Sequence, residues 1–166
     1  MTAALNLEVR RLNMGDAQQV RRWLDVLDAY AQDPMGGGQP LPADTRARLP
    51  QAWAECAGAS SWLAWVGDEA VGLLNAVAGF STFAARPLLN VHDLAVLPAW
   101  RGQGVGRALL RAAEAEARRM GACKLTLEVL SGNTGAAALY ASEGYALYAL
   151  DPAQGTAQFM QKPLRD

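Results

Sequence analysis

The chain has little of what marks several classes of protein. Its 166 residues include only two cysteines and one histidine, and its formal net charge is -1. The cysteines, Cys56 and Cys123, form no C-x-x-C pair and have no neighbouring histidine, which argues against a disulfide framework and against a metal site. No lysine and arginine cluster supplies the basic face that nucleic-acid binding requires. We therefore expect neither a resident metal nor a nucleic-acid partner.

Long apolar runs and a basic leader are missing as well. No segment approaches the ~20 apolar residues that a membrane span needs, and the first ten residues lack a basic stretch followed by an apolar one. These absences predict a cytoplasmic protein without a membrane partner.

What the chain does have is enough apolar sequence for one core. Hydrophobic residues make up 51% and charged residues 19%, which suits an α/β domain of this length. Asp16 is the expected N-cap of a first helix that ends before the Pro/Gly stretch 33–42, a stretch that is either a linker or a border of the acceptor pocket. Further helices are expected at 44–57, 105–120 and 136–142, and strands at 7–12, 61–66, 70–83, 88–97, 124–130, 145–150 and 158–161.

The most informative segment is a glycine loop, Arg101-Gly102-Gln103-Gly104-Val105-Gly106. It follows an apolar strand pattern and opens a helix pattern rich in alanine, leucine and arginine. Glycines at alternate positions remove every second Cβ, so a ligand can lie against the backbone N–H groups at the positive end of the helix dipole. The segment predicts an anion site, and a diphosphate suits it best.

Two common phosphate motifs are poor matches to this loop. A P-loop requires lysine followed by serine or threonine after its last glycine, and here Arg107 and Ala108 follow. The dinucleotide motif G-x-G-x-x-G begins at Gly102, but Arg107 stands in place of its third glycine. Pro98 and Trp100 also lengthen the turn beyond the tight one that this motif needs.

The surrounding motifs resemble those of the GNAT superfamily of N-acetyltransferases. The family's loop, Q/R-x-x-G-x-G/A, is matched by Arg101-x-x-Gly104-x-Gly106. Its L-x-V-x-P strand end is matched by 94–98, and its N-x-x-x-A-x-L-Y-x-x-x-G-F/Y segment by 133–145. The resemblance implies a single N-acetyltransferase domain over residues 1–166. It also implies a mixed central sheet of six to seven strands, with splayed parallel strands in its middle and helices on both faces.

The resemblance further implies that the diphosphate belongs to acetyl-CoA, the cosubstrate. The main chain of the splayed strand would hold the pantetheine arm, and the loop would hold the diphosphate. Ordinary sheet pairing, a surface arginine and a helix cap by Asn133 are the alternatives for individual members of this set. The expected cofactor-binding residues are Leu94, Ala95, Val96, Arg101, Gly102, Gln103, Gly104, Val105, Gly106, Arg107 and Asn133.

Two side chains are candidates for the proton transfers of an amine acetylation. Tyr140 matches the family's tyrosine, and a phenol is a suitable acid for a departing thiolate. His92 lies two residues before Leu94, where alternation points it to the face of Asn90 and Leu94 and points Asp93 to the opposite face. Neutral imidazole can accept a proton at cytosolic pH. A core tyrosine and a core histidine are the alternatives.

The acceptor is the least determined part of the prediction. The segment 80–83 before the Arg86-Pro87 turn resembles small-amine and polyamine acetyltransferases, which favours a small primary amine. Asp25, Asp28, Asp33 and Asp44 could collect a polycation or form a solvated face. A protein N-terminus, a lysine, an amino acid, an aminoglycoside and a non-catalytic acyl-CoA sensor stay open, and a homodimer is compatible with the five tryptophans.

Overall fold

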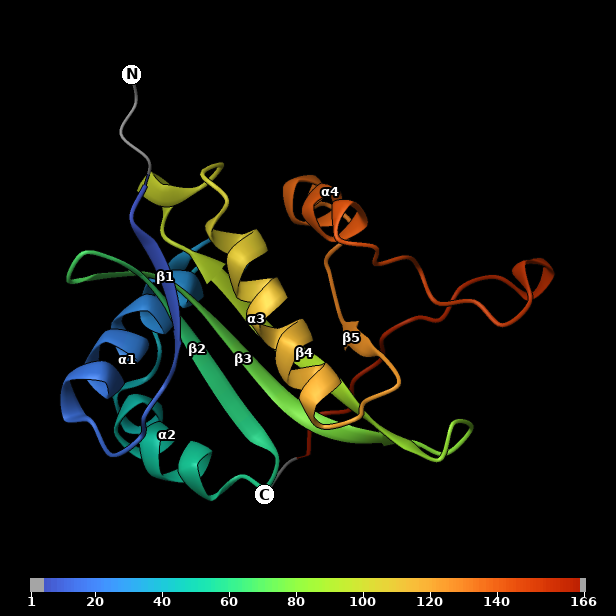
Figure 1. The fold of residues 1–166 in the computed structure, drawn as a ribbon, viewed down its shortest axis with the longest axis horizontal. Helices are drawn as coiled ribbons and strands as arrows, with labels where there is room; N and C mark the ends of the chain where they lie inside the picture. Colours follow the sequence, from blue (N-terminus) through green and yellow to red (C-terminus); the bar gives the residue numbers. More distant parts are fainter. Residues whose placement is uncertain (1–4, 165–166) are drawn as a thin grey trace. The chain divides into compact units, whose positions relative to one another are not determined.

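Five strands form one sheet in the order in which they occur along the chain. A computed structural model describes residues 5–164, and the chain divides into two compact units, the first ending at Leu127 and the second beginning at Glu128. The strands all lie in the first unit (Figure 1). The first four run antiparallel to their neighbours and the fifth is parallel to the fourth: β1 (Leu7–Arg11), β2 (Ala59–Val66), β3 (Glu69–Ser81), β4 (Arg86–Val96) and β5 (Leu125–Leu127).

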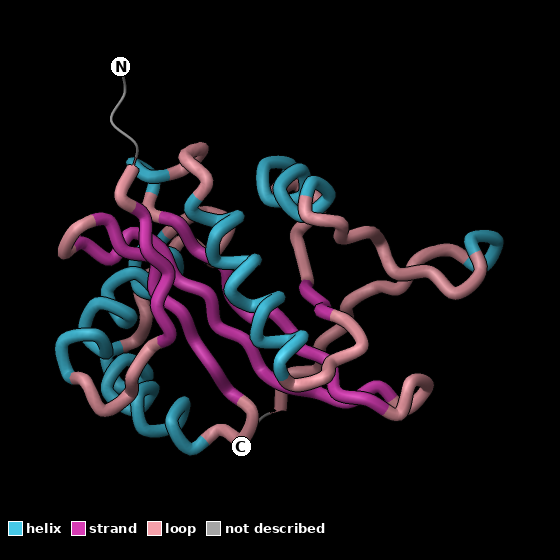
Figure 2. Tube along the Cα trace, viewed as in Figure 1, coloured by secondary structure: helices cyan, strands magenta, loops and turns pink. Residues whose placement is uncertain are grey.

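Helices cover both faces of this sheet, as predicted. Helices α1 (Ala17–Gln32) and α2 (Ala43–Glu55) lie on one face and α3 (Val105–Arg119) lies on the other (Figures 1 and 2). Leu73 belongs to the core that α1 builds with Trp23. A Cβ on the neighbouring Gly72 would meet Leu109 and Val105 of α3. Successive residues of β3 therefore face the two helical layers alternately.

The first helix forms where its cap and its apolar stripe predict it. The side chain of Asp16 accepts hydrogen bonds from the backbone N–H groups of Gln18 and Gln19, which would otherwise lack partners at a helix start. Trp23 and Leu27 point into the core, and Trp23 is completely buried. No helix within residues 5–164 is both long and apolar enough to cross a membrane.

The expectation of six to seven strands is wrong for this structure. The sheet of the described chain has five strands, and β5 is its edge, so the splayed parallel pair is not in the middle. The stretches 145–150 and 158–161 form no strands, although strands were expected at both. A strand needs a neighbour to pair with, and the backbone bond from Ala157 N–H to Tyr148 O starts one residue before the second stretch instead of forming part of a ladder between the two.

The second unit is built around one helix. Helix α4 (Thr134–Ser142) begins after Asn133, whose side chain accepts from Ala136 N–H at 3.2 Å. A short 3-10 turn, η2 (Pro152–Gln154), is the other helical element. Large apolar side chains of this unit are exposed, namely Leu130, Leu147, Tyr148, Leu150, Phe159, Met160 and Leu164.

Candidate active site

An open strand edge lies where β4 and β5 separate. Their parallel pairing covers only three residue pairs and ends at Val91 with Leu127. Beyond that point β4 continues to Val96 and pairs with β3 alone, and within residues 5–164 no strand pairs with its other edge. The predicted pantetheine-binding residues Leu94, Ala95 and Val96 all lie on this stretch. Its backbone can therefore accept an added extended chain.

A β-bulge at His92 interrupts the pairing of β4 with β3 just before this stretch. Asp93 pairs with Asn75 and Val91 pairs with Ala76, so His92 is the extra residue of β4. Its side chain is exposed, and Nδ1 lies 3.3 Å from Oδ1 of Asn90. The predicted shared face of His92 and Asn90 is thus confirmed.

The same bulge corrects the rest of the predicted alternation. Asn75 contacts Trp23 of α1, and its strand partner Asp93 lies on the same side of the sheet. Asn90 pairs with Val77, two residues from Asn75, so it shares that side. Leu94 pairs with Leu74 and faces α3. His92 therefore lies on the face of Asp93 and not on that of Leu94, because an inserted residue shifts the period of two.

The glycine loop opens α3 as predicted. Gly104 is the N-cap residue with φ +86°, and Gly102 has φ +74°. A Cβ at either position would meet nothing within 4 Å, so their backbone faces open space. Within the described chain no side chain caps this helix, which leaves its first N–H groups available to a ligand. Of the remaining predicted residues, Gln103 precedes the N-cap, and three lie in the first turn of α3: Val105, Gly106 and Arg107.

Arg101 orders the loop by joining three segments. Its Nε donates to the carbonyl of Val96 at 3.0 Å, and an Nη donates to Asp33 at 2.8 Å. The hydrogen bond from Arg101 holds the pKa of Asp33 below its usual range, with help from the N–H of Met35. Arg101 therefore connects the open end of β4 to the C-terminal end of α1. A solvated surface arginine, the alternative interpretation, would make neither contact.

Two of the predicted residues lie in the second unit. Asn133 caps α4 through its side-chain oxygen, as in the helix-cap alternative. Tyr140 lies on α4 and is partly buried, with its ring centroid 5.9 Å from that of Tyr145.

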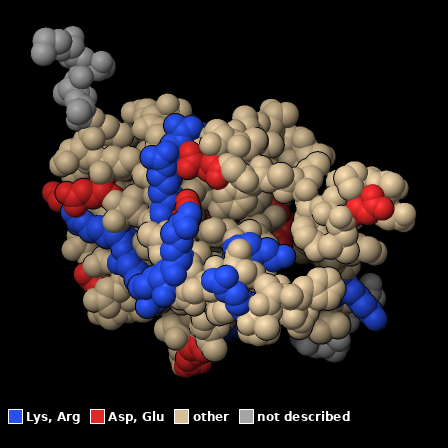
Figure 3. Space-filling view, turned by 45° about the vertical axis from the view of Figure 1, so that its right-hand side comes forward, with Lys and Arg blue, Asp and Glu red and all other residues tan. Residues whose placement is uncertain are grey.

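The four aspartates considered for a polycation site are all bound by arginines of the same chain. Arg46 pairs with Asp25 and Asp28, Arg48 with Asp44, and Arg101 with Asp33. Further pairs join α3 to itself and to β1, and basic and acidic side chains lie beside one another on the face drawn in Figure 3. These four carboxylates therefore already have cationic partners.

Sequence reasoning missed Asn75, the one fully buried amide of β3. It accepts from Trp23 and from Ser61, and it donates to Asp93. The signal was present, since a lone asparagine interrupts an apolar stretch, Val71-Gly72-Leu73-Leu74-Asn75-Ala76-Val77-Ala78. A buried amide in such a run must find hydrogen-bond partners, which marks it as a part of a network.

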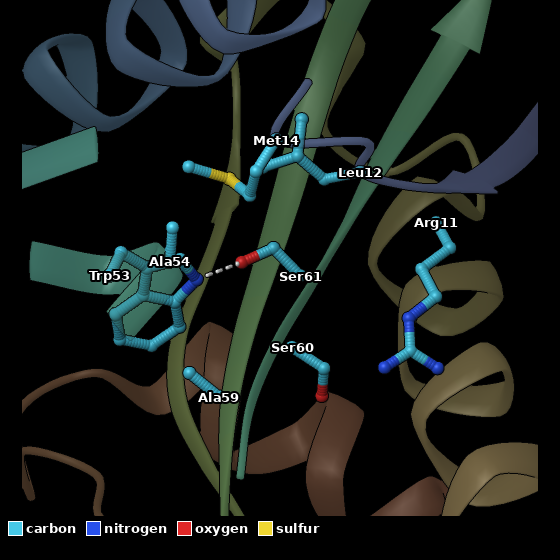
Figure 4. A pocket seen from close by; sticks show the side chains of 8 residues that line it. All are labelled: Arg11, Leu12, Met14, Trp53, Ala54, Ala59, Ser60 and Ser61. Carbon is cyan, nitrogen blue, oxygen red and sulfur yellow. Dashed lines mark hydrogen bonds between the residues drawn. The ribbon is translucent and has the colours of Figure 1, made fainter. Parts of the chain in front are cut away.

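This network begins at a cavity of about 150 Å³ beside the end of β1. Figure 4 shows Trp53 and Ser61 on one side of it, joined by a hydrogen bond of 2.9 Å, and Arg11 on the other. The full lining is Arg11, Leu12, Met14, Trp53, Ala54, Ala59, Ser60 and Ser61. None of the predicted site residues lines it, so this cavity and the glycine loop are separate features of the first unit.

Comparison with known proteins gives the family of the chain. The model of the acetyltransferase (GNAT) family matches residues 23–145. The chain belongs to this family. It is 42% identical over 93 residues to a streptothricin acetyltransferase of Streptomyces lavendulae, covering 53% of this chain and 49% of that protein. It is 31% identical over 147 residues to a mycothiol acetyltransferase of Geodermatophilus obscurus, covering 87% of this chain and 46% of that protein.

The chain thus spans about half the length of these curated relatives. Among solved structures, the aminoglycoside N-acetyltransferase AAC(6')-Iy in complex with CoA has the same fold. Its TM-score is 0.74 at 16% identity, covering 100% of this GNAT chain and 99% of that one.

Proposed function

We propose that this GNAT protein transfers the acetyl group of acetyl-CoA directly to a primary amine of a small molecule. The observation that carries the proposal is the combination of an open edge on β4 with an uncapped glycine loop at the start of α3. An open strand edge can bind an amide-bearing chain, and a helix N-terminus can bind a diphosphate. Coenzyme A contains both groups in one molecule.

The roles of the binding residues follow from their positions. The main chain of Leu94, Ala95 and Val96 would hold the pantetheine arm. The N–H groups of the segment 102–107 would hold the diphosphate, and Arg101 would keep that segment in place through Val96. Asn133 would act by capping the helix that carries Tyr140. We also propose that the two units make up one N-acetyltransferase domain, because the family match crosses their boundary.

The chemistry requires a neutral amine and two proton transfers. The amine nitrogen attacks the thioester carbonyl carbon, so that a C–N bond forms and the C–S bond breaks. Tyr140 gives its proton to the departing sulfur and regains one from water, and His92 accepts the proton that the nitrogen loses and passes it to water, so that no net proton is released. The products are an N-acetylated amine and the free thiol of CoA.

A thiol-release assay tests this function most directly. Purified protein and acetyl-CoA are combined with primary amines, amino acids, polyamines, peptides, aminoglycosides and streptothricin, the last two chosen from the names of the similar acetyltransferases. Amine-dependent release would support transfer and identify the acceptor. Tight binding of acetyl-CoA without thiol release in the presence of any of the amines would contradict transfer and favour a non-catalytic acyl-CoA-binding module.

A further inference from the structure

A buried hydrogen-bond network ends at Asp93, next to the bulge. Asn75 is 1% exposed, and its Oδ1 accepts from Trp23 Nε1 at 2.8 Å and from Ser61 Oγ at 2.6 Å. Its Nδ2 donates to Oδ2 of Asp93 at 2.9 Å. Because the amide oxygen already accepts two bonds, the amide nitrogen must point to Asp93. The network therefore fixes where this carboxylate lies.

The donors of the network all point the same way. Trp53 Nε1 donates to Ser61 Oγ, Ser61 donates to Asn75, and Asn75 donates to Asp93. An indole N–H has no acceptor function, so Trp53 sets this direction for the Ser61 hydroxyl, and Trp23 sets it for the amide of Asn75. Such a chain keeps a carboxylate in one orientation without neutralising its charge.

Asp93 has no ion-pair partner in the described part of the chain. Among residues 5–164, no arginine, lysine or histidine forms an ion pair with this partly buried side chain. Its charge acts on the same side of the sheet at Tyr30, where burial, then Asp93 and Asp33, raise the pKa of the phenol. A half-buried carboxylate without a cation favours binding of one.

We propose that Asp93 binds a protonated amino group of the acceptor beside His92, and that Asn75 is the residue that positions Asp93. This inference rests on the proposed N-acetyltransferase function. An amine held by a carboxylate is kept in its charged form, so the nitrogen at Asp93 is not the nitrogen that attacks. The acceptor class is therefore one with at least two amino groups, one bound as the ammonium and a second that is acetylated.

Kinetics with a matched pair of amines tests this selectivity. Putrescine and n-butylamine have the same four-carbon chain and differ by one amino group. The unmodified protein should prefer putrescine in kcat/KM by at least about tenfold, the order expected for one charge-assisted hydrogen bond. Equal efficiency with both amines, or no use of putrescine, would overturn the inference.

The Asp93→Asn variant removes the charge and keeps an oxygen that can accept from Asn75. It should lose the preference through a rise of about tenfold in the KM for putrescine, with the KM for acetyl-CoA unchanged. Asp44→Asn removes one charge from the surface of α2 and should leave the preference intact. A putrescine preference that survives in Asp93→Asn would overturn the role of Asp93.

Asn75→Ala tests the positioning role, with Trp53→Phe as its control. Both variants leave donors or acceptors of the network without a partner and should lower the melting temperature. Only Asn75→Ala removes the bond to Asp93, so only it should raise the KM for putrescine without raising that for n-butylamine. Equal kinetic effects of both variants would contradict positioning, and Asp93→Asn still decides the inference if Asn75→Ala does not fold.

The two proposals fail in different ways. If no amine of the panel causes thiol release from acetyl-CoA, the proposed function itself is overturned. Thiol release from acetyl-CoA that is equally efficient with monoamines and with diamines would leave the proposed function standing and overturn the role of Asp93 alone.

Discussion

At the scale of single residues, the proposed reaction depends most on the proton donor Tyr140. A thiolate leaves readily only if it is protonated as the C–S bond breaks, and general acids of this kind contribute about 10²–10⁴-fold to a rate. Tyr140→Phe should therefore lower kcat in the thiol-release assay by at least about 100-fold, with the affinity for acetyl-CoA unchanged. Tyr148→Phe removes a hydroxyl from an exposed tyrosine of the same unit and should retain activity. Full activity of Tyr140→Phe would contradict the assignment.

The residues that sequence reasoning found and missed differ in how local their signal is. The caps of Asp16 and Asn133 follow from side-chain chemistry within one helical turn, and the structure has Asp16 as the expected cap of α1 and Asn133 as the cap of α4 that one of its two alternatives described. The face of Asp93 depends on a bulge, which is a property of two paired strands. Asn75 depends on partners from three segments, so its role appears only after folding.

At the scale of elements, the two ends of α3 provide a matched test of the glycine loop. Gly104 at its start and Gly121 just after its end both have positive φ, and a Cβ at either would meet nothing within 4 Å. Alanine at either position should cost about 1–2 kcal/mol of stability, because the left-handed conformation is unfavourable for residues with a Cβ. Only Gly104→Ala should also weaken acetyl-CoA binding, as measured by calorimetry. Equal weakening by both variants would argue against the loop as the diphosphate site.

The contact between β1 and α3 predicts a specific acid sensitivity. Glu116 of α3 binds Arg119 and Arg11, and the hydrogen bond from Arg119, with Arg11 second, lowers its pKa from 4.5 to about 2. A carboxylate with a lowered pKa in the folded state stabilises the fold above pH 4.5 and loses this contribution as the pH falls towards 2. Glu116→Gln should flatten the dependence of unfolding free energy on pH in this range, measured by urea denaturation.

The control for that measurement is Glu114→Gln on the same helix. Glu114 pairs with Arg118 four residues on, a surface pair that contributes little to stability. Its removal should leave the acid dependence close to that of the unmodified protein. Identical pH profiles for Glu116→Gln and Glu114→Gln would contradict the role given to the β1 to α3 contact.

Helices were predicted better than strands for a physical reason. The expected ranges 105–120 and 136–142 differ by one or two residues from α3 and α4, since periodicity and caps act within a helix. The expected strands 145–150 and 158–161 contain large apolar residues but form no ladder, and β5 is three residues long where seven were expected. Strand pairing depends on distant segments, which a local pattern does not describe.

At the scale of the whole molecule, three short motifs were enough to predict the fold class and the family. Binding of the cosubstrate should also be measurable on this scale, as a rise in the stability of the folded chain. A ligand that binds only the folded chain stabilises it by about 2.7 kcal/mol at 100 times its Kd. For a chain of this size that corresponds to a rise in melting temperature of about 5–10 °C. Acetyl-CoA should produce this shift. ADP, which has the diphosphate but not the arm that the edge of β4 would bind, should produce a smaller one, because only the loop can hold it. No shift with acetyl-CoA in a folded sample would contradict the cosubstrate site, whereas equal shifts with both ligands would limit the site to the glycine loop and remove the open strand from it.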